Sequence, residues 1–140
     1  MPTRKASAVW TGGLKGGNGS YSGESGIKGP YSFGSRFENA GGSNPEELLA
    51  AAEAACFSMA LSGALERNGT PPTRVETTAA CTVEKVGDGF TITRIALDVR
   101  AFVPQIDQAT FERIAGETKE GCPVSRALKA VDIQLKAQLV

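Results

Sequence analysis

The hydrophobic positions of residues 44–65 are spaced for a long helix with apolar side chains on almost every face. Asn44 suits the cap of this helix, Pro45 suits its first position, and Glu46 complements the positive end of the helix dipole. A helix that is apolar all round is expected to be buried. Its start is too polar, and its residues are too small, for a membrane span. We therefore predict a buried central helix that stops at Asn68-Gly69 and around which the rest of the chain packs.

Alternating hydrophobic and polar residues predict strands before and after this helix. The expected strands are 6–10, 20–22, 31–33, 74–85, 90–103 and 131–139. The glycine-rich segment 1–35 is expected to form an antiparallel meander, with a flexible arm as the alternative. A hairpin turn is predicted at residues 87–89, and a change of phase after Ile92 predicts a bulge near Thr93 and Arg94.

Two shorter helices are predicted between the hairpin and the last strand. Asp107 is placed to cap the first, which Gly121 ends, and Pro123 lies in the first turn of the second. The resulting order is strands, long helix, hairpin, two short helices, strand. It predicts an α+β fold with mainly antiparallel sheet packed around the central helix. We expect residues 1–140 to form a single domain.

Composition excludes several classes of function. The 15 basic and 15 acidic residues balance, so nothing indicates a nucleic acid or an acidic membrane as a partner. No apolar run follows Arg4 and Lys5, so we expect no signal peptide or transmembrane segment and predict a cytoplasmic protein. The sequence has no histidine, which excludes Cys-His and Ser-His nucleophilic pairs. Three unclustered cysteines are a poor zinc set, and we predict neither a metal nor a cofactor.

The three cysteines have different surroundings. Cys81 lies on the apolar side of a predicted strand, where a free cysteine behaves as a small hydrophobic residue. Cys122 opens a helix, whose free N–H groups stabilise a thiolate. Cys56 lies in the middle of the central helix, where the helix dipole has little effect, so its position alone would make it an inert core cysteine. Any reactive cysteine in this chain needs an arginine, a lysine or a helix N-terminus to lower its pKa.

Four motifs carry a resemblance to a known family. They are GSRFE at 34–38, NPEELLAAAEAACFSMAL at 44–61, GFTIT at 89–93 and GCPVS at 121–125. Together they resemble the OsmC/Ohr family of cysteine-based peroxidases, which reduce hydroperoxides. The resemblance extends over nearly the whole chain. It is closer to the OsmC branch, because Arg36 directly precedes the long helix instead of lying near the N-terminus.

The resemblance implies a set of site residues. The peroxidatic cysteine matches Cys56 and the resolving cysteine matches Cys122. The active-site arginine matches Arg36, and the glutamate paired with it matches Glu46. Family members often have histidine where this chain has Glu53. Because an unpaired buried carboxylate is costly, we expect Glu53 to reach an edge of the fold or to pair with a basic residue.

The resemblance implies reduction of organic hydroperoxides and, more weakly, of hydrogen peroxide, and these residues are chemically suited to a peroxidase. Arg36 stays charged at physiological pH, so it can stabilise a Cys56 thiolate and orient the peroxide, and we expect Glu46 to hold it by a bidentate ion pair. The Cys56 sulfenic acid then condenses with Cys122 to a disulfide. The resemblance implies an external dithiol reductant, of lipoyl or comparable type, and a role in the oxidative or osmotic stress response.

Helix geometry adds a prediction about assembly. Glu46 and Cys56 are separated by about 15 Å along one helix. They serve one site if the Arg36 side chain spans much of the gap, or if Glu46 comes from a second subunit. We predict an intertwined homodimer with two sites at its interface, as the family resemblance also implies.

Two other classes of function remain open from the sequence. One is a redox sensor in which a Cys56–Cys122 disulfide changes a surface without turnover. The other is a dimeric carrier that binds a small ligand in an apolar cleft. The preferred peroxide is also open, because Phe57 and Met59 suit either a bulky alkyl chain or the core.

Overall fold

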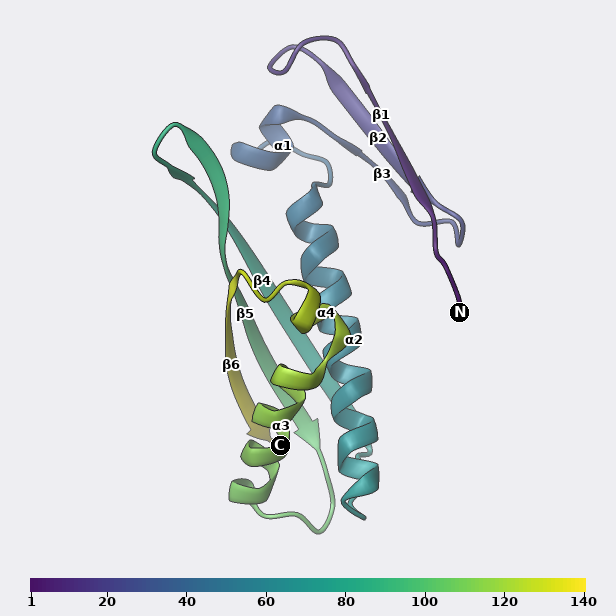
Figure 1. The fold of residues 1–140 in the computed structure, drawn as a ribbon, viewed down its shortest axis with the longest axis vertical. Coiled ribbons are helices and arrows are strands. Elements are labelled where there is room, and N and C mark those ends of the chain that lie inside the picture. Colours follow the sequence, from purple (N-terminus) through teal and green to yellow (C-terminus); the bar gives the residue numbers. More distant parts are fainter. The chain divides into compact units, whose positions relative to one another are not determined.

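The computed structural model describes residues 1–140, which divide into two compact units (Figure 1). The first unit is Met1–Glu47 and the second is Leu48–Val140. Each is described by itself below. The prediction that residues 1–140 form a single domain stays a prediction.

The first unit is an ordered antiparallel meander, as predicted for the glycine-rich segment. Its three strands are paired in chain order: β1 (Ala6–Thr11), β2 (Asn18–Gly23) and β3 (Lys28–Tyr31). Phe33 was expected in the third strand but begins the short helix α1 (Phe33–Phe37). Ser32 and Ser35 cause this difference, because each side-chain hydroxyl accepts a hydrogen bond from the other residue's backbone N–H, at 3.0 and 2.8 Å. This reciprocal capping box stabilises a helix start.

The central helix has the ends that the sequence predicts. α2 (Pro45–Arg67) begins after Asn44, whose side-chain oxygen accepts a 2.7 Å hydrogen bond from the Glu47 N–H. Its last residue is Arg67. The chain then turns at Gly69, which has a φ of 81°, and the Thr70 N–H bonds back to the Leu65 carbonyl at 3.0 Å. Glycine adopts this left-handed conformation without steric cost, so it is well suited to stop a helix.

The second unit contains a three-stranded mixed sheet. Its strands are β4 (Arg74–Val86), β5 (Gly89–Phe102) and β6 (Asp132–Leu139), in that order. β4 and β5 form the predicted antiparallel hairpin, and Thr93 is the extra residue of the predicted bulge, since Arg94 pairs with Thr82 and Ile92 with Val83. The strand pairing is mainly antiparallel, as predicted, but β6 pairs parallel to β5. The reason is the crossover through two helices, because a crossover of this kind returns a strand in the same direction.

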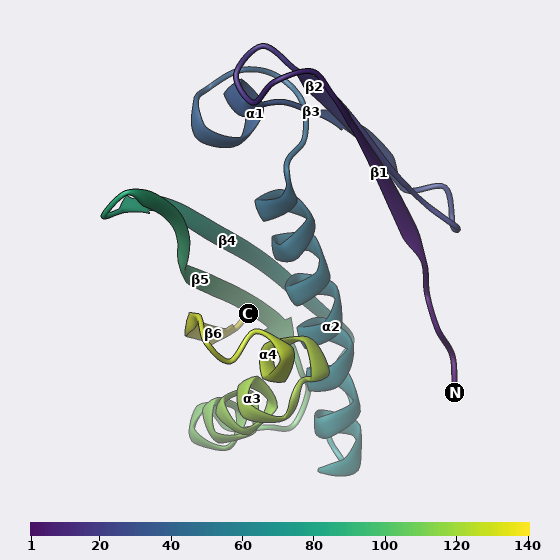
Figure 2. The ribbon, with the colours of Figure 1, turned by 45° about the horizontal axis from the view of Figure 1, so that its top comes forward.

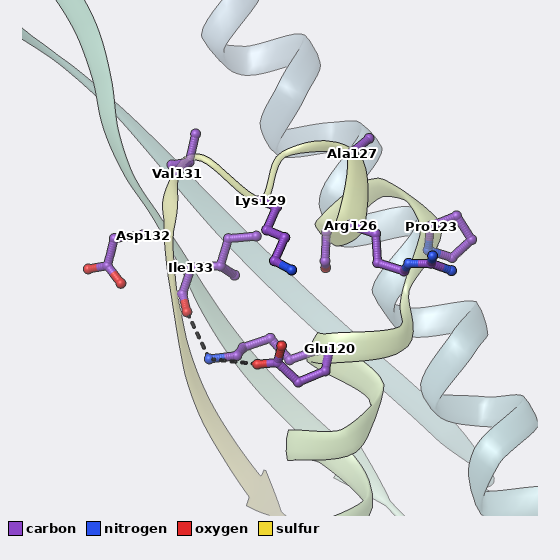
Figure 3. A pocket seen from close by; sticks show the side chains of 10 residues that line it. Glu120, Pro123, Arg126, Ala127, Lys129, Val131, Asp132 and Ile133 are labelled. Carbon is purple, nitrogen blue, oxygen red and sulfur yellow. Dashed lines mark hydrogen bonds and ion pairs between the residues drawn. The ribbon is translucent and has the colours of Figure 1, made fainter.

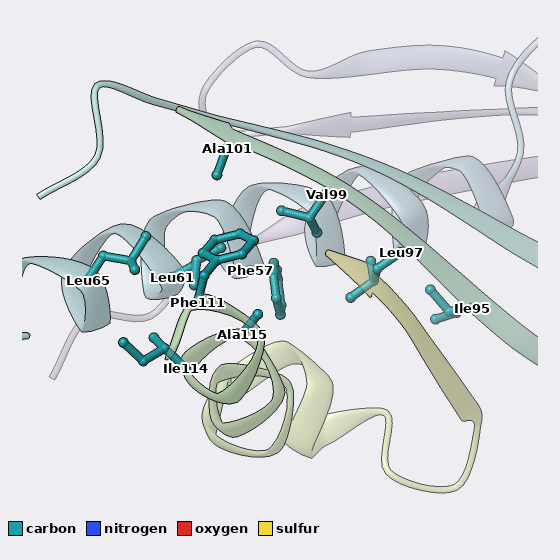
Figure 4. Packing of buried hydrophobic residues seen from close by; sticks show 10 residues of the cluster. All are labelled: Phe57, Leu61, Leu65, Ile95, Leu97, Val99, Ala101, Phe111, Ile114 and Ala115. Atoms are coloured by element: carbon teal, nitrogen blue, oxygen red, sulfur yellow. The ribbon is translucent and has the colours of Figure 1, made fainter. Parts of the chain in front are cut away.

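The crossover helices are α3 (Gln108–Gly121) and α4 (Pro123–Ala127). Asp107 caps α3 as predicted, accepting a 2.6 Å hydrogen bond from the Thr110 N–H. Within the second unit, α2, α3 and α4 lie on one face of the β4–β6 sheet (Figure 2). The core lies between these two layers, and its buried side chains are shown in Figure 4: Phe57, Leu61, Leu65, Ile95, Leu97, Val99, Ala101, Phe111, Ile114 and Ala115.

Within a single chain, α2 buries one face only. Phe57 and Leu61 are fully buried, whereas Met59 is 76% exposed and Ala55 is also exposed. This differs from the expectation of a helix buried all round, because within one chain the sheet and the other helices pack against only one side of α2. By length and composition α2 is apolar enough to cross a membrane, a property that core helices of soluble proteins share.

Candidate redox site

Two cysteines meet between α2 and the start of α4. The Sγ atoms of Cys56 and Cys122 lie 2.9 Å apart, and both residues are free thiols. Cys56 is carried by the middle of α2, and Cys122 lies at the corner where Pro123 begins α4. Cys56 is half-buried and Cys122 is only 1% exposed. The pair is close enough to form a disulfide with a small adjustment, since a disulfide brings two sulfurs to about 2.05 Å.

The surroundings of Cys56 within this unit favour the neutral thiol. Burial raises the pKa of Cys56 above its ordinary value of 9.0, and the hydrogen bond with Cys122 raises it further. The backbone hydrogen bond with Val124 lowers the pKa, while the negative charges of Cys122 and Glu53 raise it. A reactive thiolate at neutral pH therefore requires a positive group in addition to these neighbours.

This raised pKa predicts a loss of stability at alkaline pH. The folded state holds the Cys56 proton more tightly than the unfolded chain does, so this contribution is complete below pH 9.0 and disappears as the pH rises through the higher folded value. With reductant present, urea unfolding should show a steeper fall in the free energy of unfolding above that pH for the wild type than for Cys56→Ala. Ser58→Ala, which removes a non-titrating hydroxyl of α2, is the control and should keep the wild-type slope. Equal slopes for the wild type and Cys56→Ala would contradict the prediction.

Arg36 and Glu46 meet within the first unit. Nε of Arg36 donates a 2.8 Å hydrogen bond to Oε1 of Glu46. The pair was expected to be bidentate, but Oε2 of Glu46 is buried without a partner. The difference arises because the guanidinium lies beside the ring of Phe37, 4.9 Å from its centroid, and engages the carboxylate through Nε. The Nη groups of Arg36 take no part in this hydrogen bond to Glu46.

The loop before α2 fixes the position of this ion pair. Oγ of Ser35, the neighbour of Arg36, donates to the Ser43 carbonyl at 2.7 Å, and the Asn44 side chain donates to the Ser35 carbonyl at 2.9 Å. Tyr21 of β2 also donates to the Ser43 hydroxyl at 2.8 Å. These bonds attach α1 to the loop that leads into α2, so Arg36 and Glu46 are held at neighbouring points.

Glu53 is a buried acidic residue close to the two thiols. It is 0% exposed and accepts a hydrogen bond through Oε1 from the Ser125 hydroxyl of α4, while its Oε2 has no partner. The expectation that Glu53 reaches an edge or pairs with a basic residue is therefore wrong. The reason is the position of Ser125, which places a neutral donor opposite the carboxylate. Sequence reasoning missed Ser125, although its spacing from Cys122 is one helical turn.

Three other residues considered in the sequence analysis, Cys81, Phe57 and Met59, lie outside these pairs. Cys81 is a half-buried residue of β4 that packs against the core, as expected for a structural cysteine. Phe57 belongs to the core, so it does not line a substrate path. Met59, Gly63, Thr118 and Cys122 line a groove between α2 and the end of α3, so this groove reaches the thiol pair on its Cys122 side.

A larger pocket lies on the other side of α4, against β6 (Figure 3). It is rimmed by charged side chains of both signs: Lys119, Glu120, Arg126, Lys129 and Asp132. Lys119 is already engaged, since its Nζ donates to the Ile133 carbonyl at 3.1 Å and lies 3.8 Å from Glu120. Neither Cys56 nor Cys122 lines this pocket, so the larger pocket is not the thiol site.

The four site residues predicted from the sequence thus form two pairs. Cys56 meets Cys122 in the second unit, and Arg36 meets Glu46 in the first. The roles assigned to these residues stay predictions.

A long helix bearing one thiol, a mixed sheet and a second thiol at a helix corner together define an OsmC-like architecture. The family model described as OsmC-like protein matches residues 38–136, and the chain belongs to this family. It lies on the OsmC branch, as predicted. The peroxiredoxin OsmC of Escherichia coli strain K12 is 50% identical over 139 residues, which cover 96% of this chain and 97% of that protein.

Less similar relatives have names from the Ohr branch of the family, organic hydroperoxide resistance protein. Organic hydroperoxide resistance protein-like 2 of Staphylococcus epidermidis is 30% identical over 95 residues, 66% of this chain and 65% of that protein. The solved structure of OhrB from Bacillus subtilis has a TM-score of 0.74 and 24% identity, covering 96% of this chain and 98% of that chain. An OsmC-like protein from Mycoplasma pneumoniae has a TM-score of 0.76 and 15% identity, covering 99% and 98%. These structural likenesses confirm the α+β fold.

Proposed function

We propose that the protein is a cysteine-based peroxidase that reduces organic hydroperoxides in the response to oxidative or osmotic stress, with hydrogen peroxide as a weaker substrate. The observation that carries this proposal is the contact between Cys56 and Cys122, at 2.9 Å between the sulfurs. The names of the relatives, peroxiredoxin and organic hydroperoxide resistance protein, support it.

The reaction begins with Cys56. Its thiolate attacks the terminal oxygen of the hydroperoxide, the O–O bond breaks, and the leaving alkoxide takes a proton to become the alcohol. Cys56 is then a sulfenic acid. The Cys122 sulfur attacks it, a disulfide forms, and the hydroxyl leaves as water with the Cys122 proton. An external dithiol, of lipoyl or comparable type, exchanges with this disulfide and restores both thiols.

Arg36 is assigned the role of stabilising the Cys56 thiolate. The neighbours of Cys56 in its own unit raise the pKa of its thiol, burial most of all, and a guanidinium supplies the positive charge that opposes this effect. The contact of Nε with Glu46 orients the side chain and leaves the Nη groups to bind the peroxide. Glu46 is therefore assigned to position Arg36.

The direct test is turnover with a defined reductant. Purified protein with dihydrolipoamide should consume tert-butyl hydroperoxide and a fatty-acid hydroperoxide faster than hydrogen peroxide. A redox sensor would form the Cys56–Cys122 disulfide once and then stop consuming peroxide, and a carrier would consume none. Failure to turn over with any of several dithiols would contradict the peroxidase.

Arg36→Lys is expected to reduce turnover by about two orders of magnitude, the loss typical for removing a donor that stabilises developing charge. Lysine keeps the positive charge but loses the planar set of donors. The measurement is kcat/KM for tert-butyl hydroperoxide as a function of pH. Arg113→Lys is the matched control, because Arg113 makes only an exposed ion pair with Glu117 and should keep wild-type activity. Wild-type activity in Arg36→Lys would contradict the assignment of Arg36 to the site.

We further propose that the active form is a homodimer in which each site takes Cys56 from one subunit and Arg36 from the other. The exposed apolar side of α2, with Met59 at 76% exposure, supports a second copy as its cover. Light scattering at micromolar concentration should therefore give twice the chain mass, and a monomer would contradict the proposal.

Mixed dimers of two inactive variants test whether sites are shared. A Cys56→Ser chain paired with an Arg36→Ala chain should regain about half of the wild-type activity, because one site then has both Cys56 and Arg36. If each site used residues of a single chain, every site in the mixed dimer would be defective. Absence of recovery would thus contradict the shared site.

A further inference from the structure

Two contacts join α2 to α4 with matched spacing. Cys56 on α2 meets Cys122 at the corner before α4, and Glu53 on α2 meets Ser125 on α4. Glu53 precedes Cys56 by three residues, and Ser125 follows Cys122 by three. Residues at this spacing lie on the same face of a helix. The thiol contact and the hydrogen bond are therefore two adjacent contacts in a single interface between α2 and α4.

The Glu53–Ser125 contact is unusual in its composition. Both residues are buried, at 0% and 4% exposure, and the ion pairs of the chain do not include Glu53. Its second carboxylate oxygen, Oε2, has no partner. A buried carboxyl group with one hydrogen bond is costly. Such a cost is understandable if the group acts on the thiol pair next to it.

The helix that carries Ser125 needs an attachment. α4 has only five residues, and its cap residue Cys122 makes no side-chain capping hydrogen bond. So short a helix is not stable by itself in water and depends on tertiary contacts. The bond from Ser125 to Glu53 is a buried polar attachment one turn away from Cys122.

We propose that Glu53 and Ser125 are positioning residues for disulfide formation: their hydrogen bond keeps the first turn of α4 on α2, so that the Cys122 sulfur stays within reach of the oxidised Cys56. The proposal rests on the peroxidase function proposed above and adds to it the control of the resolving step. When Cys56 gains an oxygen, the two sulfurs must rearrange from a thiol contact into a covalent bond. Attachment of α4 limits how far Cys122 can move during this change.

The carboxylate has a second, separable effect on the same thiol. The titratable groups whose charge acts on Cys56 are Cys122 and Glu53, and both raise the pKa of Cys56. Glu53→Gln removes the charge but keeps an acceptor for the Ser125 hydroxyl. Ser125→Ala removes the donor but keeps the carboxylate. The two variants therefore separate the attachment of α4 from the electrostatic effect.

The experiment follows disulfide formation in a single turnover. Reduced protein is mixed with an aromatic disulfide reagent (dithiobisnitrobenzoate), which leaves a mixed disulfide on Cys56. Attack by Cys122 then forms the Cys56–Cys122 bond and releases a second, coloured thiolate. This readout requires no peroxide, so it remains valid if the peroxidase function fails. A parallel reaction with tert-butyl hydroperoxide follows loss of the Cys56 sulfenic acid by mass spectrometry.

Ser125→Ala should slow the second release about tenfold, because a hydrogen bond to a charged group is worth at least that factor in an equilibrium constant. Ser125→Thr keeps the hydroxyl and should restore the rate. Ser58→Ala is the matched control. It removes a hydroxyl of α2 that bonds Thr77 at 2.7 Å, away from α4, and should leave the release unchanged.

Glu53→Gln should slow the release less than Ser125→Ala does. In a Cys122→Ser background it should also shift the midpoint of Cys56 alkylation to lower pH, whereas Ser125→Ala should not. Wild-type release rates in both Ser125→Ala and Glu53→Gln would overturn the proposal, whatever the peroxidase assay shows. Slowed release without peroxide turnover would support the positioning role and reject only the peroxidase.

Discussion

Replacing Cys56 with serine is expected to reduce hydroperoxide consumption to the uncatalysed background. The reaction requires a sulfur that can accept the peroxide oxygen, and a serine hydroxyl is neither ionised at neutral pH nor oxidisable in this way. Because Cys56 and serine differ by one atom and Cys56 is only half-buried, the fold should survive the change. The measurement is loss of tert-butyl hydroperoxide with dihydrolipoamide as the reductant.

The other two cysteines provide the controls for this result. Cys81→Ser should keep turnover, because Cys81 packs against the core from β4. Cys122→Ser should consume one equivalent of peroxide to form the Cys56 sulfenic acid and a second equivalent to form the sulfinic acid, and should then stop. If Cys56→Ser kept turnover and Cys81→Ser lost it, the assignment of the nucleophile would be refuted.

Replacing Phe57 with alanine is expected to destabilise the fold by about 3–5 kcal/mol, the range for a large aromatic side chain removed from a core. Phe57 is 0% exposed and lies next to Cys56 on α2 (Figure 4). Its loss leaves a cavity between α2 and the β4–β6 sheet. Since small proteins are stable by only about 5–15 kcal/mol, the variant should unfold at a much lower urea concentration.

Phe102→Ala is the matched control for this prediction. Phe102 lies at the end of β5 and is 56% exposed, so its removal should change the free energy of unfolding by no more than about 0.5 kcal/mol. Comparable losses in both variants would mean that Phe57 contributes no more to the core than an exposed side chain. Urea unfolding followed by circular dichroism measures both.

The local features of the fold could be predicted because adjacent residues cause them. Asn44 and Asp107 accept hydrogen bonds from backbone N–H groups three residues on, so each helix start is specified by a short sequence. Gly69 ends α2 for a similarly local reason. The bulge at Thr93 followed from a change of hydrophobic phase within one strand. The resemblance to a family added the two cysteines and the Arg36–Glu46 pair, which periodicity alone did not identify.

Three features depended on contacts between segments far apart in the chain. The parallel pairing of β6 with β5 follows from the path of the crossover, which the alternation of β6 does not reveal. The burial of α2 on one face follows from the number of layers that pack against it. An apolar sequence indicates that a helix is shielded from water, but not which elements shield it. Glu53 was expected to reach an edge of the fold or to pair with a basic residue, because no sequence signal connects it to Ser125.

The sequence by itself determined where the long helix and the two crossover helices begin, and which two sulfurs are candidates for chemistry. Only the tertiary structure brought Cys56 to 2.9 Å from Cys122 and placed a buried hydroxyl opposite Glu53. The physical reason is the range of the forces involved. Caps, turns and periodicity act within a few residues, whereas the proximity of side chains 66 and 72 residues apart is set by how α2 and α4 pack on one sheet.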